Sequence, residues 1–171
     1  MNISVRKPCV KGVRACDEQD RSPQPFDGDV GTQAKPSTTG AIENAIIEKL
    51  KSEIPNFLIE GFPDKPSEFI LIHPIGAILV HYQGSNYSNS QSIGYINQEN
   101  KKEFAITVVT RDLRSNNGAY KMLDKVRSIL TGFQIPGCSK LTPTKDGFIS
   151  EKAGIWQYGI NFTLTTKNIE I

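Results

Sequence analysis

The stretch GIWQYGINFTLTT, residues 154–166, alternates apolar and polar side chains along its length. Its apolar positions are Trp156, Tyr158, Ile160, Phe162 and Leu164. The positions between them are Gln157, Gly159, Asn161, Thr163 and Thr165. A period of two places successive side chains on opposite faces of a strand. The pattern therefore predicts a half-buried antiparallel strand and a sheet at the centre of the fold.

Neighbouring segments complete the predicted sheet. Residues 140–154 are the expected hairpin partner, with the turn in EKAG and with Pro143 at the sheet edge, because proline donates no ladder hydrogen bond. Residues 76–84 and 102–113 carry apolar side chains on both faces, as expected of inner strands. Residues 85–92, SNYSNSQS, have turn chemistry and no apolar spacing, which predicts a long exposed loop.

Two other segments show the helical period. Residues 41–54 place apolar side chains on one stripe and end at Pro55, with Thr38 or Thr39 as the expected N-cap. Residues 116–133 carry a second apolar stripe. Two amphipathic helices need one apolar surface to cover, and a sheet supplies it. The predicted fold class is α+β, an antiparallel sheet of four to five strands with both helices packed on one face.

The composition is that of a globular chain without a strong electrostatic field. Of its 171 residues, 37% are hydrophobic and 22% charged, and the formal net charge is only +2. Such a charge gives no general attraction to nucleic acid or to an anionic membrane. The longest apolar stretch, residues 69–82, is interrupted by His73 and Pro74 and is shorter than the roughly 20 residues of a bilayer span. We expect neither a membrane nor a specific nucleic-acid partner.

The first forty residues differ from the rest of the chain. Residues 1–40 are rich in Pro, Gly, Ser, Thr and mixed charges, with too few apolar side chains for a core of their own. We therefore divide the chain into an extended N-terminal arm, 1–40, and an α+β domain, 41–171. Forty extended residues reach about 130 Å, which is enough to contact another subunit. An arm folded back on its own core is the alternative.

The sequence shows no catalytic, cofactor or metal pattern. His73, His81 and Cys138 lack the spacing of a metal site or of a nucleophile with its base. His81 is expected to be a packing histidine with satisfied hydrogen bonds. Neither GxGxxG, GxxxxGK[ST] nor GxSxG occurs. We expect a protein without cofactor or enzymatic activity.

The stretch RDLRSNNGAY, residues 111–120, could hold an anion at the start of the second helix, since helix N-termini bind phosphates. A structural role explains the same residues: Ser115, Asn116 or Asn117 caps the helix, and Gly118 permits a tight entry. We interpret this stretch as the joint between a strand and a helix.

Four stretches together resemble a known family. They are residues 79–88, residues 104–133, the PGC at 136–138 and residues 154–166. The order R-x-L-R-x-x-x-G-A-Y-x-x-L-x-x-V-R followed by G-x-W-Q-Y resembles a tail-protein family of Mu-like phages and prophages, which is similar to the tail terminators of long-tailed phages. The resemblance covers about residues 41–168 and leaves the arm out.

The resemblance implies a structural protein of the virion, assembled in the bacterial cytoplasm. Such proteins form a ring, usually of six copies, at the head-proximal end of the tail tube, where they stop tube growth and meet the head connector. The implied partners are further copies of this chain, the tail tube protein, the head–tail connector or neck proteins and, in the contractile tails towards which the resemblance leans, the sheath. DNA passes through the ring lumen without sequence recognition.

We expect the ring to use the polar face of the last strand and two further groups of side chains. The first group belongs to the joint and consists of Arg111, Arg114, Asn116, Asn117 and Tyr120. The second group belongs to the loop expected at 85–98 and consists of Tyr87, Ile93, Tyr95 and Ile96. These aromatic and aliphatic residues would be unusual on a loop without a partner, unless they fold back on their own sheet. A ferredoxin-like module that binds a ligand or nucleic acid is the alternative function.

Overall fold

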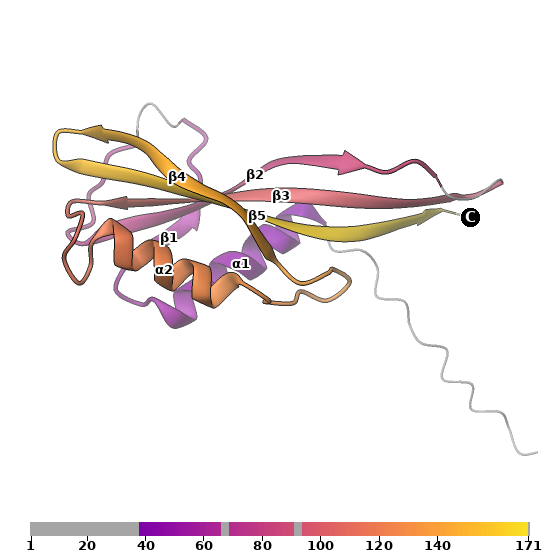
Figure 1. Cartoon of the computed structure of the whole chain (residues 1–171), viewed down its shortest axis with the longest axis horizontal. Helices are drawn as coiled ribbons and strands as arrows, with labels where there is room; N and C mark the ends of the chain where they lie inside the picture. Colours follow the sequence, from indigo (N-terminus) through magenta and orange to yellow (C-terminus); the bar gives the residue numbers. More distant parts are fainter. Residues whose placement is uncertain (1–37, 66–68, 91–93, 171) are drawn as a thin grey trace, which may run out of the picture. The chain divides into compact units, whose positions relative to one another are not determined.

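The computed structural model describes residues 38–65, 69–90 and 94–170. The elements follow the order α1 (Thr39–Glu53), β1 (Leu58–Gly61), β2 (Gly76–Tyr87), β3 (Ile96–Thr110), α2 (Ala119–Leu130), β4 (Thr142–Lys152) and β5 (Ile155–Glu170). The predicted arm lies outside the described residues apart from its last three, where α1 begins. Both helices lie on the same side of the sheet, so the predicted α+β class is confirmed (Figure 1).

The sheet has five strands in the order β1-β2-β3-β5-β4. All neighbours pair antiparallel except β1 and β2, which run parallel, so the expectation of a purely antiparallel sheet is wrong at that edge. Parallel neighbours need a crossover. The connection between β1 and β2 provides it on the face opposite the helices, where Phe62, Phe69 and Leu71 pack on Ala77 and Leu79.

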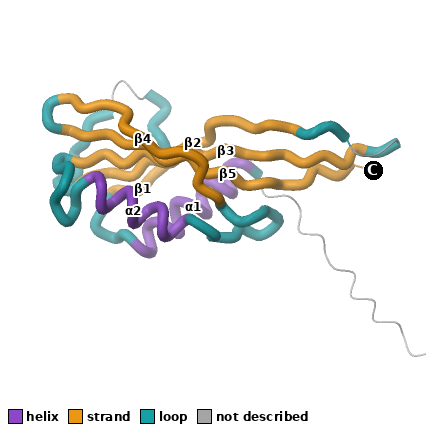
Figure 2. Tube along the Cα trace, viewed as in Figure 1, coloured by secondary structure: helices purple, strands orange, loops and turns teal. Residues whose placement is uncertain are grey.

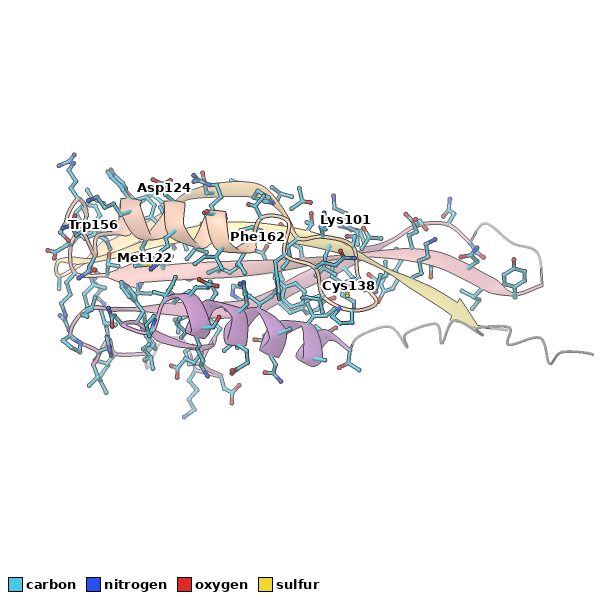
Figure 3. The ribbon with its side chains drawn as sticks, turned by 90° about the horizontal axis from the view of Figure 1, so that it is seen from below. Lys101, Met122, Asp124, Cys138, Trp156 and Phe162 are labelled. Atoms are coloured by element: carbon cyan, nitrogen blue, oxygen red, sulfur yellow. The ribbon has the colours of Figure 1, made fainter. Side chains whose placement is uncertain are left out.

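The main core lies between the helices and the sheet (Figure 2). Facing pairs Phe104–Phe162 and Ile106–Ile160 come from the β3–β5 register, and all four side chains are buried. The helices contribute Ile42, Ile46 and Leu50 from α1 and Met122, Val126 and Leu130 from α2. Figure 3 shows Met122 and Phe162 between α2 and the sheet, with Asp124 on the outer side of the helix. The apolar stripes predicted from the sequence are therefore the packed faces.

β2, β3 and β5 continue beyond the helices as a sheet extension (Figure 1). β2 runs to Tyr87 and β3 begins at Ile96, so residues 85–87 of the loop expected at 85–92 belong to a strand. Residues 88–90 form no strand, as predicted, and residues 91 and 92 lie outside the described residues. β3 and β5 stay paired from Ile96 opposite Glu170 to Thr110 opposite Trp156. The hydrogen bonds between strands join backbone groups and do not depend on the side chains. A polar segment that does not alternate with apolar residues can therefore still form a strand when it lies beside another strand. The polar side chains of residues 85–87 therefore predict a loop, although their backbone forms the end of β2.

The β4–β5 hairpin agrees with the prediction. Lys152 pairs with Ile155, and the two residues between them, Ala153 and Gly154, have φ values of 52° and 76°. Positive φ at both positions is the two-residue turn that suits the twist of a hairpin. β4 is an edge strand and contains Pro143, as expected.

The helix starts follow different rules. Thr38 caps α1, because its Oγ1 accepts a hydrogen bond from Ala41 N–H at 3.3 Å. No side chain caps α2, so the expected cap by Ser115, Asn116 or Asn117 is wrong. Instead, the N–H of Ala119 donates to the carbonyl of Asp112 at 3.0 Å and that of Tyr120 to the carbonyl of Leu113 at 3.2 Å. These amides are used within the joint, which supports its structural interpretation over anion binding.

Gly118→Ala tests the tightness of this joint. A Cβ at position 118 would lie 2.7 Å from the carbonyl atoms of Leu113 and 2.8 Å from Ser115 N. We expect G118A to lower the free energy of unfolding by about 1–3 kcal/mol, as overpacking against backbone does. The matched control is Gly40→Ala near the start of α1, where a Cβ meets nothing within 4 Å. Urea denaturation measures both, and a G118A protein as stable as G40A would contradict the prediction.

Candidate interaction surfaces

The joint surface consists of Arg111, Arg114, Asn116, Asn117 and Tyr120, and all five side chains are exposed. The first, third and fourth line an open hollow of about 600 Å³ together with Pro74 and Ile75. Two members have partners within the chain. Arg111 Nη2 donates to the Leu71 carbonyl at 2.8 Å, and Lys121 Nζ donates to Asn116 Oδ1. These two hydrogen bonds fix the side chains of Arg111 and Asn116 in the joint surface.

Tyr120 at the end of this surface contacts β5. Its ring lies edge-on to that of Tyr158, with centroids 5.8 Å apart. The pKa of Tyr158 is raised, mainly by a hydrogen bond with Tyr120 and also by partial desolvation. The positive charge of Arg114 lowers the pKa of Tyr158 and so acts against these two effects. Tyr120 remains 43% exposed, so one side of its ring is available to a partner.

The tip surface lies at the end of the β2–β3 hairpin and consists of Tyr87, Tyr95 and Ile96. Their exposed fractions are 59%, 48% and 47%. Ile93, the fourth residue expected here, lies outside the described residues. In the part of the chain that the structure describes, these side chains do not fold back into a core, which was the alternative to a partner contact.

The two surfaces are separate. The joint follows the last residue of β3, and the tip includes its first residue, Ile96. β3 has 15 residues. At about 3.3 Å per residue the ends of this strand lie about 46 Å apart. One sheet therefore presents two dissimilar surfaces at opposite ends.

Sequence reasoning missed four exposed apolar residues. Ile70 and Ile72, which precede β2, are 75% and 87% exposed, and Phe148 and Ile149 in β4 are 56% and 52% exposed. A signal was present in both places. Consecutive apolar residues in an extended segment point to opposite sides, so they cannot all face one core.

The polar face of β5, also proposed as an interface, lies over a shallow groove on the side of the sheet away from the helices. Asn161 Nδ2 donates to Gln83 Oε1 and to Glu103 Oε1, each at 2.9 Å. The groove has a volume of about 240 Å³, and Gly159 and His81 also line it. Hydrogen bonds among its own side chains thus order this face.

The histidines and the cysteine do not meet. His73 Nδ1 accepts hydrogen bonds from the N–H groups of Ile75 and Gly76 at 3.4 Å, so it shapes the turn before β2. Cys138 is buried in the main core on the helix side of the sheet, and Figure 3 shows it near the start of the sheet extension. His81 lies on the opposite face in the groove. The sheet separates the thiol from this imidazole.

His81 differs from the satisfied packing histidine that we expected. Its ring packs on Phe62 with centroids 4.9 Å apart, but its buried Nδ1 has no hydrogen-bond partner among the described residues. Burial lowers its pKa below the usual 6.5, and the charge of Glu43 acts in the opposite direction. The predicted packing role of His81 is confirmed. The prediction that its ring nitrogens all have hydrogen-bond partners is wrong.

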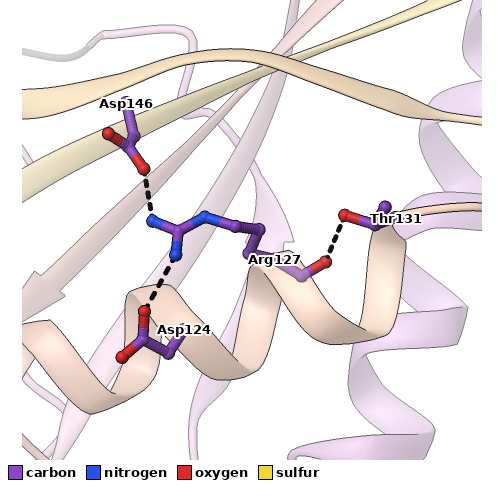
Figure 4. Close-up of polar contacts among 4 residues, drawn as sticks. All are labelled: Asp124, Arg127, Thr131 and Asp146. Atoms are coloured by element: carbon purple, nitrogen blue, oxygen red, sulfur yellow. Dashed lines mark hydrogen bonds and ion pairs between the residues drawn. The ribbon is translucent and has the colours of Figure 1, made fainter.

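One ion pair of Arg127 joins α2 to the edge strand β4, and a second lies within α2 (Figure 4). Arg127 Nη1 donates to Asp124 Oδ1 at 2.9 Å, Arg127 Nη2 donates to Asp146 Oδ2, and Thr131 Oγ1 donates to the Arg127 carbonyl at 2.6 Å. The hydrogen bond with Asp146 is the main cause that raises the pKa of Arg127. These groups are partly exposed, so the pair contributes at most about 1 kcal/mol.

Comparison with protein-family models matches residues 46–171 to the Gp37 protein family. The chain belongs to the Gp37 family. This is a phage protein family, so the chain is a phage protein, as the sequence resemblance implied. A comparison with curated proteins finds no match.

The Gp37 match covers every strand and both candidate surfaces but leaves out the first part of α1 and everything before it. Among the described residues, no helix is long and apolar enough to cross a membrane. The same part of the chain holds no group of three or more His, Cys, Asp or Glu side chains placed to bind a metal ion.

His81→Phe tests the electrostatics of the groove. The substitution keeps a ring against Phe62 and removes the titrating group. Because burial lowers the pKa of His81, the unfolded chain binds a proton first, and this residue lowers stability as the pH falls below its unfolded pKa of about 6.5. We expect H81F to lose less unfolding free energy than the wild type between about pH 7.5 and about pH 5. Since all other groups are shared, equal losses in urea denaturation would contradict the prediction.

Proposed function

We propose that this protein is a tail terminator of a long-tailed phage. Copies of the chain form a ring of six at the head-proximal end of the tail tube, end tube polymerisation and meet the head connector. The proposal is supported by one observation. In this phage protein, dissimilar exposed surfaces lie at the two ends of β3, the apolar tip at one end and the polar joint at the other. A terminator needs this arrangement, because it binds the tube on one side and a different structure on the other.

The mechanism is one of surface geometry. The upper end of a growing tube exposes a surface that accepts the next ring of tube protein. A terminator covers this surface and offers another one that tube protein does not fit, so addition stops. The tip surface, with Tyr87 and Tyr95, suits an apolar contact, and the joint surface, with Arg111 and Arg114, suits a polar one. The neighbours are the tube protein, the neck or connector proteins and, in a contractile tail, the sheath.

We further propose that the protein has no catalytic activity and no cofactor. Cys138 packs in the core, and the sheet separates it from His81. The ferredoxin-like alternative needs exposed aromatic side chains on a sheet face that binds bases. The groove side of β5 carries Gln157, Gly159 and Asn161 instead.

The oligomeric state and the phenotype of gene loss test the proposal together. Size-exclusion chromatography with light scattering on the full chain should give a species with six times the 18.9 kDa mass of one copy. Electron microscopy of lysates in which this gene is silenced should show tail tubes of uncontrolled length that are not joined to heads. A monomer in the first experiment, or tails of normal length joined to heads in the second, would contradict the function.

Deletion of residues 1–35 tests the role of the arm. Thr38, which caps α1, stays in place, so the truncated domain should remain folded and show a cooperative thermal unfolding transition. We expect it to be incorporated into virions less well than the full chain, as quantified by immunoblotting of purified particles. Full incorporation would show that the arm plays no part in assembly.

A further inference from the structure

The two edges of the sheet both carry exposed apolar side chains. The strand order places β1 at one edge and β4 at the other. Beside β1, Ile70 and Ile72 line a hollow of about 510 Å³ together with Leu58 and Phe69. We call this group, with Glu60 and Asp64, the β1-edge patch. Monomeric proteins seldom leave such clusters uncovered, so the patch indicates a contact.

The opposite edge of the sheet, strand β4, also carries exposed apolar side chains. We call this group the β4-edge patch, and it consists of Phe148, Ile149, Lys145 and Lys152. The Phe148 ring packs edge-on against Tyr158 at 5.5 Å between centroids. Ile149 Cδ1 lies 3.0 Å from where a Cβ on Gly159 would be. Neighbouring residues thus fix both side chains, while more than half of each remains exposed. Preorganised apolar side chains of this kind lose little entropy on binding.

The charges of the two patches are complementary. Lys145 and Lys152 lie on β4, and Glu60 and Asp64 lie at the β1 edge, all of them exposed. None of the four has an ion pair in the ranges that the structure describes. β4 also carries Asp146, which pairs with Arg127, and Glu151, which accepts a hydrogen bond from the N–H of Gly154. Lys65 also lines the hollow at the β1 edge. Opposite charges around apolar centres are the usual arrangement of a specific protein contact.

The contact is made by side chains and not by adding a strand. β4 contains Pro143, and its pairing with β5 is interrupted by two register shifts. Proline, lysine and bulges are the features that keep an edge strand from pairing with another chain. Phe148 packs against Tyr158 and Ile149 against Gly159, on opposite sides of this edge strand. Ile149, on the groove side, can still enter the hollow beside Ile72.

We infer that the β4-edge patch of one copy binds the β1-edge patch of the next copy. This inference rests on the proposed ring and names the surfaces that close it. A contact between two different patches is head-to-tail, and repetition with rotation closes it into a ring in which every copy has both patches covered. A single dimer, or a partner at one edge, would leave the other patch exposed. A second copy is therefore the occupant that accounts for both edges.

Two charge-introducing variants test the inference. Ile72→Lys places a cation where the lysines of the next copy lie, and Phe148→Glu places an anion opposite Glu60 and Asp64. Each is expected to weaken the subunit contact by about tenfold or more, as substitution at the centre of an interface does. Light scattering should then show smaller species than the wild-type ring. Ser128→Lys on the outer side of α2 is the matched control and should leave the ring intact.

Mixing the two variants gives the sharpest result. The I72K chain keeps its β4-edge patch and the F148E chain keeps its β1-edge patch, so an equimolar mixture should form at least a heterodimer of twice the chain mass, larger than either variant alone. If F148E proves misfolded by circular dichroism, Lys145→Glu replaces it, since this exposed side chain has no core contact. Rings that survive both substitutions, or a mixture without heterodimer, overturn the inference and leave the proposed function standing. A monomeric wild type overturns both.

Discussion

The antiparallel register between β3 and β5 is the constraint on which the other features depend. It places Phe104 opposite Phe162 and Ile106 opposite Ile160, on the face that α1 and α2 cover. A slip of one residue would turn these side chains to the groove side, because strand side chains alternate. The same pairing leaves β1 and β4 at the two edges and carries the sheet beyond the helices. The positions of the tip, the joint and both edge patches follow from it.

Much of the fold was predictable because its core is strongly periodic. The alternation in residues 154–166 and the apolar stripe of α2 each allowed one interpretation, and both were confirmed. The predictions failed where backbone hydrogen bonds decide the structure. The polar residues 85–87 form a strand because β3 lies beside them, and the start of α2 uses carbonyls of its own joint in place of a side-chain cap. Neither effect has a signature in side-chain pattern.

The interaction surfaces were predictable only in part. The aromatic residues Tyr87 and Tyr95 stood out in polar sequence and are exposed. Ile72 and Phe148 did not stand out, because each lies in a short apolar run, residues 69–72 or 148–149, that the sequence alone does not distinguish from core. Their exposure depends on which strands became edges, and this is decided by the pairing of segments far apart in the sequence. A sheet with exposed apolar side chains at both edges and at one end, and exposed polar side chains at the other end, is suited to binding several neighbours at once.

Electron cryomicroscopy of the complete virion is the most direct test of the central claim, that this chain forms a closed ring between tail tube and head. The map should contain a ring at the head-proximal end of the tail into which copies of the domain fit, with the β4 edge of each copy against the β1 edge of the next. A virion whose neck contains no density for this domain, or which places the domain elsewhere in the particle, would contradict the claim.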